Sequence, residues 1–157
     1  MLVKFLALYG SDVNLLREKP AWLNFVDHTG DAGIFVRASD LEEPFARAAW
    51  GMFYLITDIN AVRPVDVEYV EVEATDLSAL MLHWLSELNY RHVTEHRLFG
   101  QFEVIQTDEE SLVAVVRGEK LDRARHEMFT EIKAVTFHAM RIQCTDRGWE
   151  AQIIFDL

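Results

Sequence analysis

The sequence of 157 residues is poor in cysteine, proline and glycine, with one, three and seven of each. With Cys144 as the lone cysteine, no internal disulfide and no thiolate metal cluster can form, so we expect a reducing compartment, the cytoplasm. No apolar run approaches the ~20 residues of a membrane-spanning helix. Residues 1–10 are apolar but carry only Lys4 as a positive charge, which disfavours a secretory signal.

Positive charge is also scarce, because 15 Lys and Arg stand against 26 Asp and Glu, for a formal net charge of −11. A chain this acidic repels the phosphate backbone and lacks the clustered Lys and Arg that nucleic-acid binding needs. We therefore expect no strong direct binding of RNA or DNA. The charge suits the binding of a cation, or docking on a basic partner surface.

Most catalytic signatures are missing, among them a glycine-rich phosphate loop, a G-x-S-x-G elbow and H-E-x-x-H. One match remains, because His92-Val93-Thr94-Glu95-His96 fits the H-x-x-E-H pattern of inverzincin metallopeptidases. The helical pattern before it fades at about Tyr90, so we interpret the segment as a polar loop leaving a helix. A metal-dependent hydrolase that uses this pair, or the carboxylates described below, is the alternative function.

The sequence does contain clear periodic patterns. After Asp76, a good N-cap, apolar residues recur at helical spacing over residues 77–88, the strongest helix signal in the chain. A second helix is predicted over residues 41–55, with Asp40 and Glu43 as a capping box. Strands are predicted over residues 22–27, 34–38, 65–74, 99–106, 112–117, 135–144 and 149–155.

These elements predict one α+β domain, a two-layer sandwich in which two main helices pack on a largely antiparallel or mixed sheet. We assign it to residues 21–157, with residues 1–20 as an N-terminal extension that is an extra strand or a loose segment. Cys144 is interpreted as a small buried residue of a strand. The predicted core includes Phe45, Met52, Met81 and Trp84.

Two acidic segments stand out. The stretch Asp27-His28-Thr29-Gly30-Asp31 offers hard oxygen ligands of the kind that suit Mg²⁺, Mn²⁺ or Ca²⁺, although such stretches are also ordinary turns with Asx hydrogen bonds. A strand that runs to Asp156 and the carboxylate of Leu157 places two anions side by side, which repel unless a cation or donor lies between them. A solvated chain end is the alternative.

A third segment, E-I-K-A-V-T-F-H over residues 131–138, reads as a strand. Along it Lys133, Val135 and Phe137 share one face, while Thr136 and His138 lie on the other. Taken alone, it is a strand with a surface lysine.

Together, the H-T-G-D turn, the E-I-K-A-V-T-F-H strand and the terminal F-D-L resemble the archease family. So do L-E-E-P-F-A-R-A-A, D-L-S-A-L-M-L-H-W-L-S-E-L and G-E-K-L-D followed by H-E. The resemblance covers about residues 22–157. Gly30 stands where the family usually has alanine, and Pro44 where it has a helix former.

The resemblance implies a protein without catalytic activity of its own, a cofactor of RtcB-type RNA ligases. These ligases join RNA ends in tRNA splicing or RNA repair, so any involvement of tRNA is indirect. Archeases promote guanylylation of the ligase's active-site histidine and support multiple turnover.

The resemblance also implies a divalent cation, with calcium as the first choice and magnesium or manganese as alternatives. Its implied ligands are Asp31, Asp156 and the carboxylate of Leu157. Four further residues are implied as part of the functional surface, facing the partner or supporting the ligands: Asp27, His28, Lys133 and His138.

Overall fold

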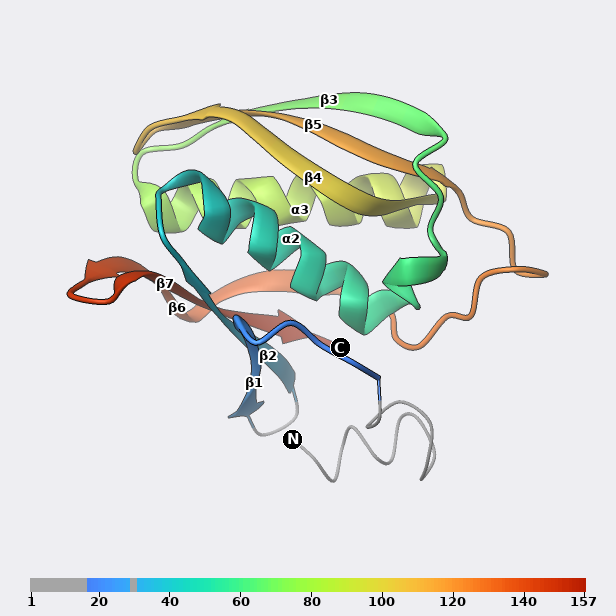
Figure 1. Ribbon diagram of the computed structural model, residues 1–157, viewed down its shortest axis with the longest axis horizontal. Coiled ribbons are helices and arrows are strands. Elements are labelled where there is room, and N and C mark those ends of the chain that lie inside the picture. The colour runs from blue at the N-terminus through green and yellow to red at the C-terminus, as the bar shows by residue number, and fades with distance from the viewer. Residues whose placement is uncertain (1–16, 29–30) are drawn as a thin grey trace.

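The computed structural model describes residues 17–28 and 31–157 (Figure 1). Its elements in chain order are β1 (Leu23–His28), β2 (Asp31–Ala38), α2 (Glu42–Ile56), the 3-10 helix η1 (Ile59–Ala61), β3 (Asp66–Glu73), α3 (Leu77–Glu95), β4 (Arg97–Thr107), β5 (Ser111–Lys120), β6 (Ala134–Thr145) and β7 (Gly148–Asp156). Among the residues described, no helix is both long and apolar enough to cross a membrane.

The strands form two antiparallel sheets with the two helices between them (Figure 1). One sheet has the order β1-β2-β7-β6, and the other has the order β3-β5-β4. Helix α2 packs against β4 and β2, and α3 packs against β6 and β3, so each helix contacts both sheets. The predicted α+β class, with two helices on antiparallel strands, is confirmed. The division of the strands into two sheets goes beyond the single sheet that was expected.

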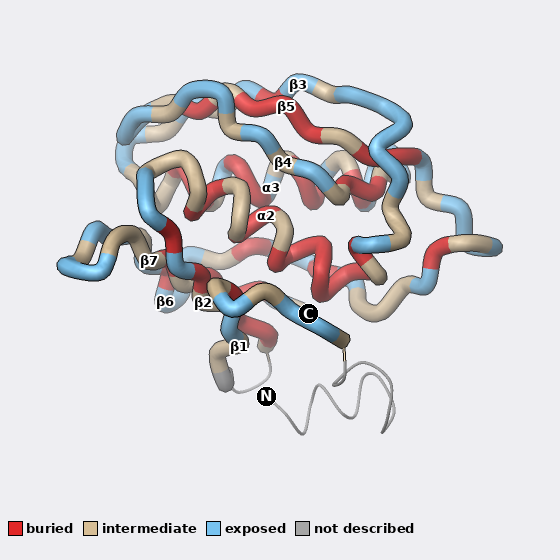
Figure 2. Tube along the Cα trace, viewed as in Figure 1, coloured by how far each residue is buried: buried red, intermediate tan, exposed pale blue. Residues whose placement is uncertain are grey.

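Helix α2 is buried along most of its length because it is covered on both sides (Figure 2). At Gly51 an added Cβ would lie 3.0 Å from Ile34 Cδ1, so this glycine lets the helix approach β2 closely. The two side chains of the predicted capping box do bond near the helix start, since Asp40 Oδ1 accepts the Glu43 N–H at 2.9 Å and the Glu43 carboxylate accepts the Ser39 N–H at 2.8 Å. The N-cap position itself is Leu41, one residue later than predicted, and Glu43 reaches Ser39 instead of the main chain of Asp40.

Helix α3 is tied to α2 through Trp84, whose indole N–H donates to the carbonyl oxygen of Phe45 at 2.8 Å. Asp76 accepts the Ala79 N–H at 2.8 Å, as expected of an N-cap. All four predicted core residues are fully buried: Phe45, Met52, Met81 and Trp84.

The predicted end of α3 near Tyr90 is wrong, because the helix continues to Glu95. His96 ends it with a left-handed backbone at φ 57°. The buried face of the helix passes from Leu88 to His92, which is 7% exposed. A buried histidine in that position reads as polar in the sequence, which hid the last turn.

The interpretation of Cys144 as buried is also wrong, because this thiol is exposed. Cys144 of β6 pairs with Trp149 of β7 through the main chain, close to the turn between the two strands. This hairpin projects beyond the helices, so no helix covers its end (Figure 1).

The described part of the N-terminal extension, residues 17–20, is not a strand. The Arg17 guanidinium lies 3.9 Å from the centre of the Tyr54 ring and donates to the carbonyl oxygen of Thr57 at 2.9 Å. This arginine therefore holds the segment against the end of α2. Residues 1–16, on which most of that prediction falls, lie outside the described residues.

Candidate functional site at the end of the four-stranded sheet

Strand pairing places Asp31 and Asp156 next to each other. Strands β2 and β7 are antiparallel, and Ala32 pairs with Phe155, so the two aspartates each lie one residue beyond this pair at the same end of the sheet. Ala32 and Phe155 are buried against the helices. Because side chains alternate along a strand, Asp31 and Asp156 belong to the opposite face.

Strand β6 brings Lys133 to the same end. Ala134 pairs with Asp156, and the Lys133 N–H donates to the Asp156 carbonyl oxygen at 2.8 Å. Lys133 is exposed, whereas the Leu157 side chain is half-buried and packs against the core. We call Asp31, Lys133, Asp156 and Leu157 the strand-end site.

Strand β1 borders the strand-end site through its main chain. His28 pairs with Asp31, and Asp27 pairs with Ala32. Thr29 and Gly30, which complete the predicted turn, lie outside the described residues.

His138 is exposed and lies further along β6, where the pairing with β7 is irregular between Thr136 and Arg141. Ala139 adopts a left-handed backbone there, with φ 53°. The predicted alternation of faces therefore stops after Thr136, and Phe137 is 57% exposed although Val135 is buried.

The strand-end site offers two side-chain carboxylates and the carboxylate of Leu157, a set of hard oxygen ligands of the type that Ca²⁺, Mg²⁺ and Mn²⁺ prefer. Residues 17–28 and 31–157 contain no group of three or more His, Cys, Asp and Glu side chains placed to hold a metal ion. The third anion of this set is a main-chain group, which is not a side chain of those types. The residues present fit a hard divalent cation, and the assignment stays a prediction.

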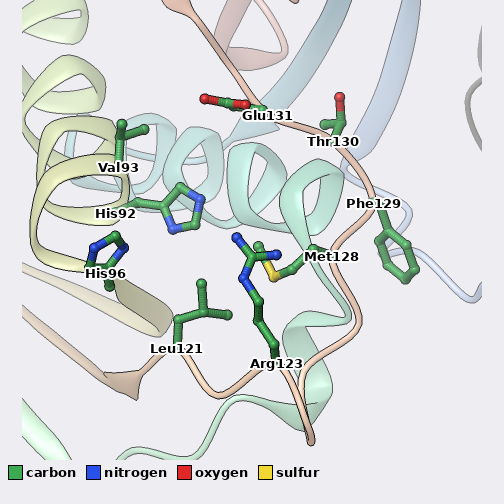
Figure 3. A pocket seen from close by; sticks show the side chains of 9 residues that line it. All are labelled: His92, Val93, His96, Leu121, Arg123, Met128, Phe129, Thr130 and Glu131. Atoms are coloured by element: carbon green, nitrogen blue, oxygen red, sulfur yellow. The ribbon is translucent and has the colours of Figure 1, made fainter.

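The histidine pair of the hydrolase alternative lies elsewhere, beside a pocket at the end of α3 (Figure 3). His92 Nδ1 lies 2.9 Å from the carbonyl oxygen of Arg97, and its ring packs edge-on against Phe53. Burial lowers the pKa of His92 below its usual 6.5. No acidic or thiol side chain among the described residues joins His92 and His96 in a metal cluster. Nothing in this arrangement supports a hydrolase.

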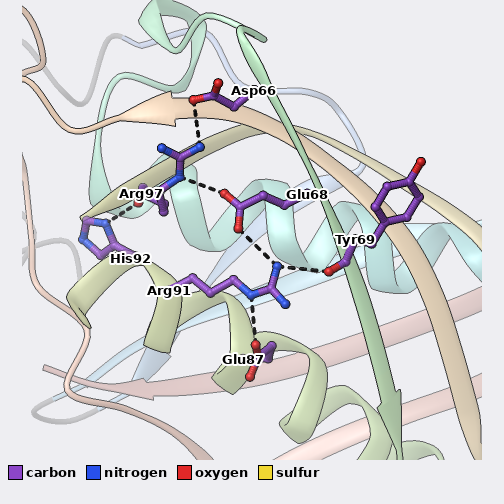
Figure 4. A network of polar contacts seen from close by, with 7 residues as sticks. All are labelled: Asp66, Glu68, Tyr69, Glu87, Arg91, His92 and Arg97. Atoms are coloured by element: carbon purple, nitrogen blue, oxygen red, sulfur yellow. Dashed lines mark hydrogen bonds and ion pairs between the residues drawn. The ribbon is translucent and has the colours of Figure 1, made fainter. Parts of the chain in front are cut away.

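A polar network beside His92 went undetected in the sequence (Figure 4). Arg97 donates to Asp66 at 2.8 Å and to Glu68 at 2.7 Å, and Arg91 joins Glu68 to Glu87. The network links the end of α3 to β3. The pairs with Asp66 and Glu68 join residues more than 20 positions apart and have no fixed spacing that a sequence pattern could reveal, whereas Glu87 and Arg91 are an i,i+4 pair within α3.

Comparison with known families identifies the family to which this fold belongs. The model of the Archease protein family matches residues 23–157. The chain belongs to this family. A curated archease of Methanopyrus kandleri is 39% identical over 135 residues, covering 84% of this chain and 96% of the relative. The archease of Pyrococcus abyssi is 40% identical over 135 residues, covering 83% and 95%.

Solved structures agree with this archease fold. The solution structure of Methanobacterium thermoautotrophicum protein 1598 is 35% identical and covers 87% of this chain and 99% of its own, with a TM-score of 0.72. The crystal structure of a Thermotoga maritima protein described as an archease and possible chaperone covers 90% and 98%, with a TM-score of 0.60. At 14% identity, the second supports the fold alone.

Proposed function

We propose that this archease activates an RtcB-type RNA ligase in the cytoplasm, by promoting ligase guanylylation and multiple turnover in tRNA splicing or RNA repair, and that it is not itself an enzyme. Membership of the family supports this role, because the role is what the sequence resemblance implies. The net charge of −11 supports an indirect part in RNA chemistry, since a chain this acidic repels RNA.

The observation that carries the proposal is the pairing of β2 with β7, which sets Asp31 and Asp156 side by side on one face of the sheet. Two adjacent carboxylates repel each other unless a cation lies between them. Asp31, Asp156 and the Leu157 carboxylate would hold one divalent cation, with calcium as the first choice and magnesium or manganese as alternatives. When bound, such an ion supplies charge that positions phosphate groups.

The strand-end site then docks at the nucleotide pocket of the ligase. Asp31 and Asp156, or the ion that they would hold, would help to organise the GTP phosphates and the ligase's own Mn²⁺ by electrostatic positioning, without forming a covalent bond. Lys133 is exposed beside Asp156 and offers an ammonium group to an anion of the partner or its nucleotide. Asp27, His28 and His138 are weaker members of this partner-facing surface.

Guanylylation of an RtcB-type ligase, measured with and without this protein, tests the proposal. We expect stimulation by the unaltered protein and none by Asp31→Ala. Asp146→Ala is the matched control, because Asp146 is an exposed aspartate in the turn between β6 and β7. Circular dichroism of both variants checks that the fold is retained. Full stimulation by a folded Asp31→Ala protein would overturn the role of the strand-end site, and no stimulation of the cognate ligase by the unaltered protein would overturn the function.

A further inference from the structure

A second candidate site lies at the C-terminal end of α3, in a pocket of about 340 Å³ (Figure 3). Its walls come from the end of α3 and from the segment between β5 and β6, residues 121–133. Two imidazoles, of His92 and His96, and the guanidinium of Arg123 line it, together with Glu131 and apolar side chains. None of the residues that line the pocket belongs to the strand-end site.

The imidazole of His92 is held in one orientation. A carbonyl oxygen only accepts hydrogen bonds, so the contact of Nδ1 with the Arg97 carbonyl at 2.9 Å places a proton on Nδ1. Asp66 and Glu68 fix Arg97 in turn (Figure 4). The other ring nitrogen of His92 is thereby left for the pocket, and Figure 3 shows the ring facing the guanidinium of Arg123.

Two arginines of the same segment differ in their partners. The Arg125 guanidinium pairs with Glu119 and donates to the Ala61 carbonyl oxygen at 3.2 Å. Arg123 is exposed, and within the described part of the chain no hydrogen bond or ion pair of its side chain is found. Its charge therefore stays available to a ligand in the pocket.

The charges around His92 favour an anionic ligand over a cation. Arg123 and His96 both oppose a positive charge on His92, and Glu131 favours it, while burial is the main reason that the pKa of His92 is lowered. A metal ion would add to the repulsion from Arg123. An anion would relieve it, and a guanidinium binds phosphate through two parallel hydrogen bonds.

We propose that this pocket binds a small organic phosphate monoester, with its phosphate between Arg123 and the two imidazoles and its organic part against Leu121 and Met128. A volume of about 340 Å³ lies at the small end of ligand pockets, which suits one phosphate and a compact organic group. Glu131 on the rim repels a longer polyphosphate and can accept a hydrogen bond from a hydroxyl or amino group of the ligand. The proposal does not depend on the ligase role.

Histidine NMR signals test the proposal directly, with adenosine monophosphate, inorganic phosphate and adenosine as probes. We expect saturable shifts of the His92 and His96 signals with adenosine monophosphate, weaker binding of inorganic phosphate at the same residues, and no response to adenosine. Arg123→Gln should raise the Kd by about tenfold, as loss of one charge-assisted contact does. Arg147→Gln is the matched control, since it removes an exposed arginine in the turn between β6 and β7.

Four results would overturn the proposal. The first is the absence of shifts at His92 and His96 with millimolar adenosine monophosphate. The second is equal weakening by Arg123→Gln and Arg147→Gln, which would show general charge attraction. The third is inorganic phosphate binding as tightly as adenosine monophosphate, because the apolar wall would then take no part. The fourth is a zinc-induced shift of both histidines without any response to phosphate monoesters, which would make the pocket a metal site.

Discussion

The strand-end site and the pocket at the end of α3 are built in different ways. At the strand end, main-chain pairing of β2, β7 and β6 sets the positions of Asp31, Asp156 and Lys133. In the pocket, side-chain contacts set the position of His92, through the Arg97 carbonyl and the Phe53 ring. The first site is mainly anionic, whereas the second combines two imidazoles and a guanidinium with Glu131 and apolar side chains.

This difference indicates at which of the two sites a side chain can be replaced, with loss of its chemical role, while the stability of the fold is kept. A β-ladder holds its residues by main-chain hydrogen bonds, so an exposed side chain can be exchanged while the ladder remains. A side chain that is itself part of the scaffold cannot be exchanged without loss of packing. Substitutions at the strand end should therefore alter function with little effect on folding, whereas substitutions of His92 should alter both.

The largest effect is expected for His92→Ala. It removes a buried ring and leaves the Arg97 carbonyl without its donor, which together should lower the free energy of unfolding by about 3 kcal/mol. His83→Ala is the matched control on the same helix, because the His83 ring bonds to the Glu73 carbonyl at 2.7 Å but is exposed. Urea unfolding measures both. Equal losses in the two variants would contradict a scaffold role for His92.

Calcium bound at the strand-end site should raise the free energy of unfolding by almost as much as His92→Ala lowers it. A cation that binds only the folded state at 100 times its Kd raises the free energy of unfolding by about 2.7 kcal/mol. We expect this gain for the unaltered protein and for Asp146→Asn, and its loss for Asp31→Asn. Thermal unfolding in calcium and in EDTA provides the measurement. A gain that survives in Asp31→Asn would place the ion elsewhere.

Acid should weaken the fold through two buried histidines, His92 and His126. The folded-state pKa of His92 is lowered, chiefly by burial, and that of His126 is lowered for the same main reason. Above the unfolded value of about 6.5 both rings are neutral in either state, so their contribution to stability is fully present. As the pH falls below 6.5 the unfolded chain takes up protons that the folded chain does not, and stability is lost until the folded pKa is passed.

The loss should not exceed about 1.4 kcal/mol per pH unit for each histidine. Urea unfolding between pH 7.5 and 5.5 measures it, and His92→Gln should reduce the slope without abolishing it, since His126 remains. A variant with the slope of the unaltered protein would show that His92 takes no part in this pH response.

The two regions also differ in how far the sequence could predict them. The meeting of Asp31 and Asp156 was implied by the family resemblance alone, because apolar alternation restricts the register of two strands but does not show which strands pair. The helices and the core around Trp84 were predictable from the residues themselves, because periodic burial leaves a periodic pattern.

The pocket could not be predicted in this way. Residues 121–133 carry no periodic pattern, and their contacts with α3 join residues far apart in the sequence, 43 positions in the hydrogen bond from Asn89 to the Ile132 carbonyl oxygen. His92 looked like part of a polar loop because burial of an imidazole against Phe53 has no signal in the local sequence. The error at Cys144 was the reverse, because a residue predicted to be buried is exposed. Strand spacing does not reveal that a hairpin projects beyond the helices that would cover it.

The smallest effect is expected for Asp156→Asn without a divalent cation. The side chain is exposed, and the ladder contact at this residue uses its carbonyl oxygen, which accepts the Lys133 N–H and is unchanged by the substitution. In EDTA the free energy of unfolding should therefore stay within about 0.5 kcal/mol of the unaltered protein. Urea unfolding gives this value, and amide hydrogen exchange at Lys133 reports the ladder itself. Faster exchange at Lys133, or a loss of unfolding free energy well above this limit, would mean that the Asp156 carboxylate helps to hold the strand end together. Substitutions at the strand end would then alter stability as well as function.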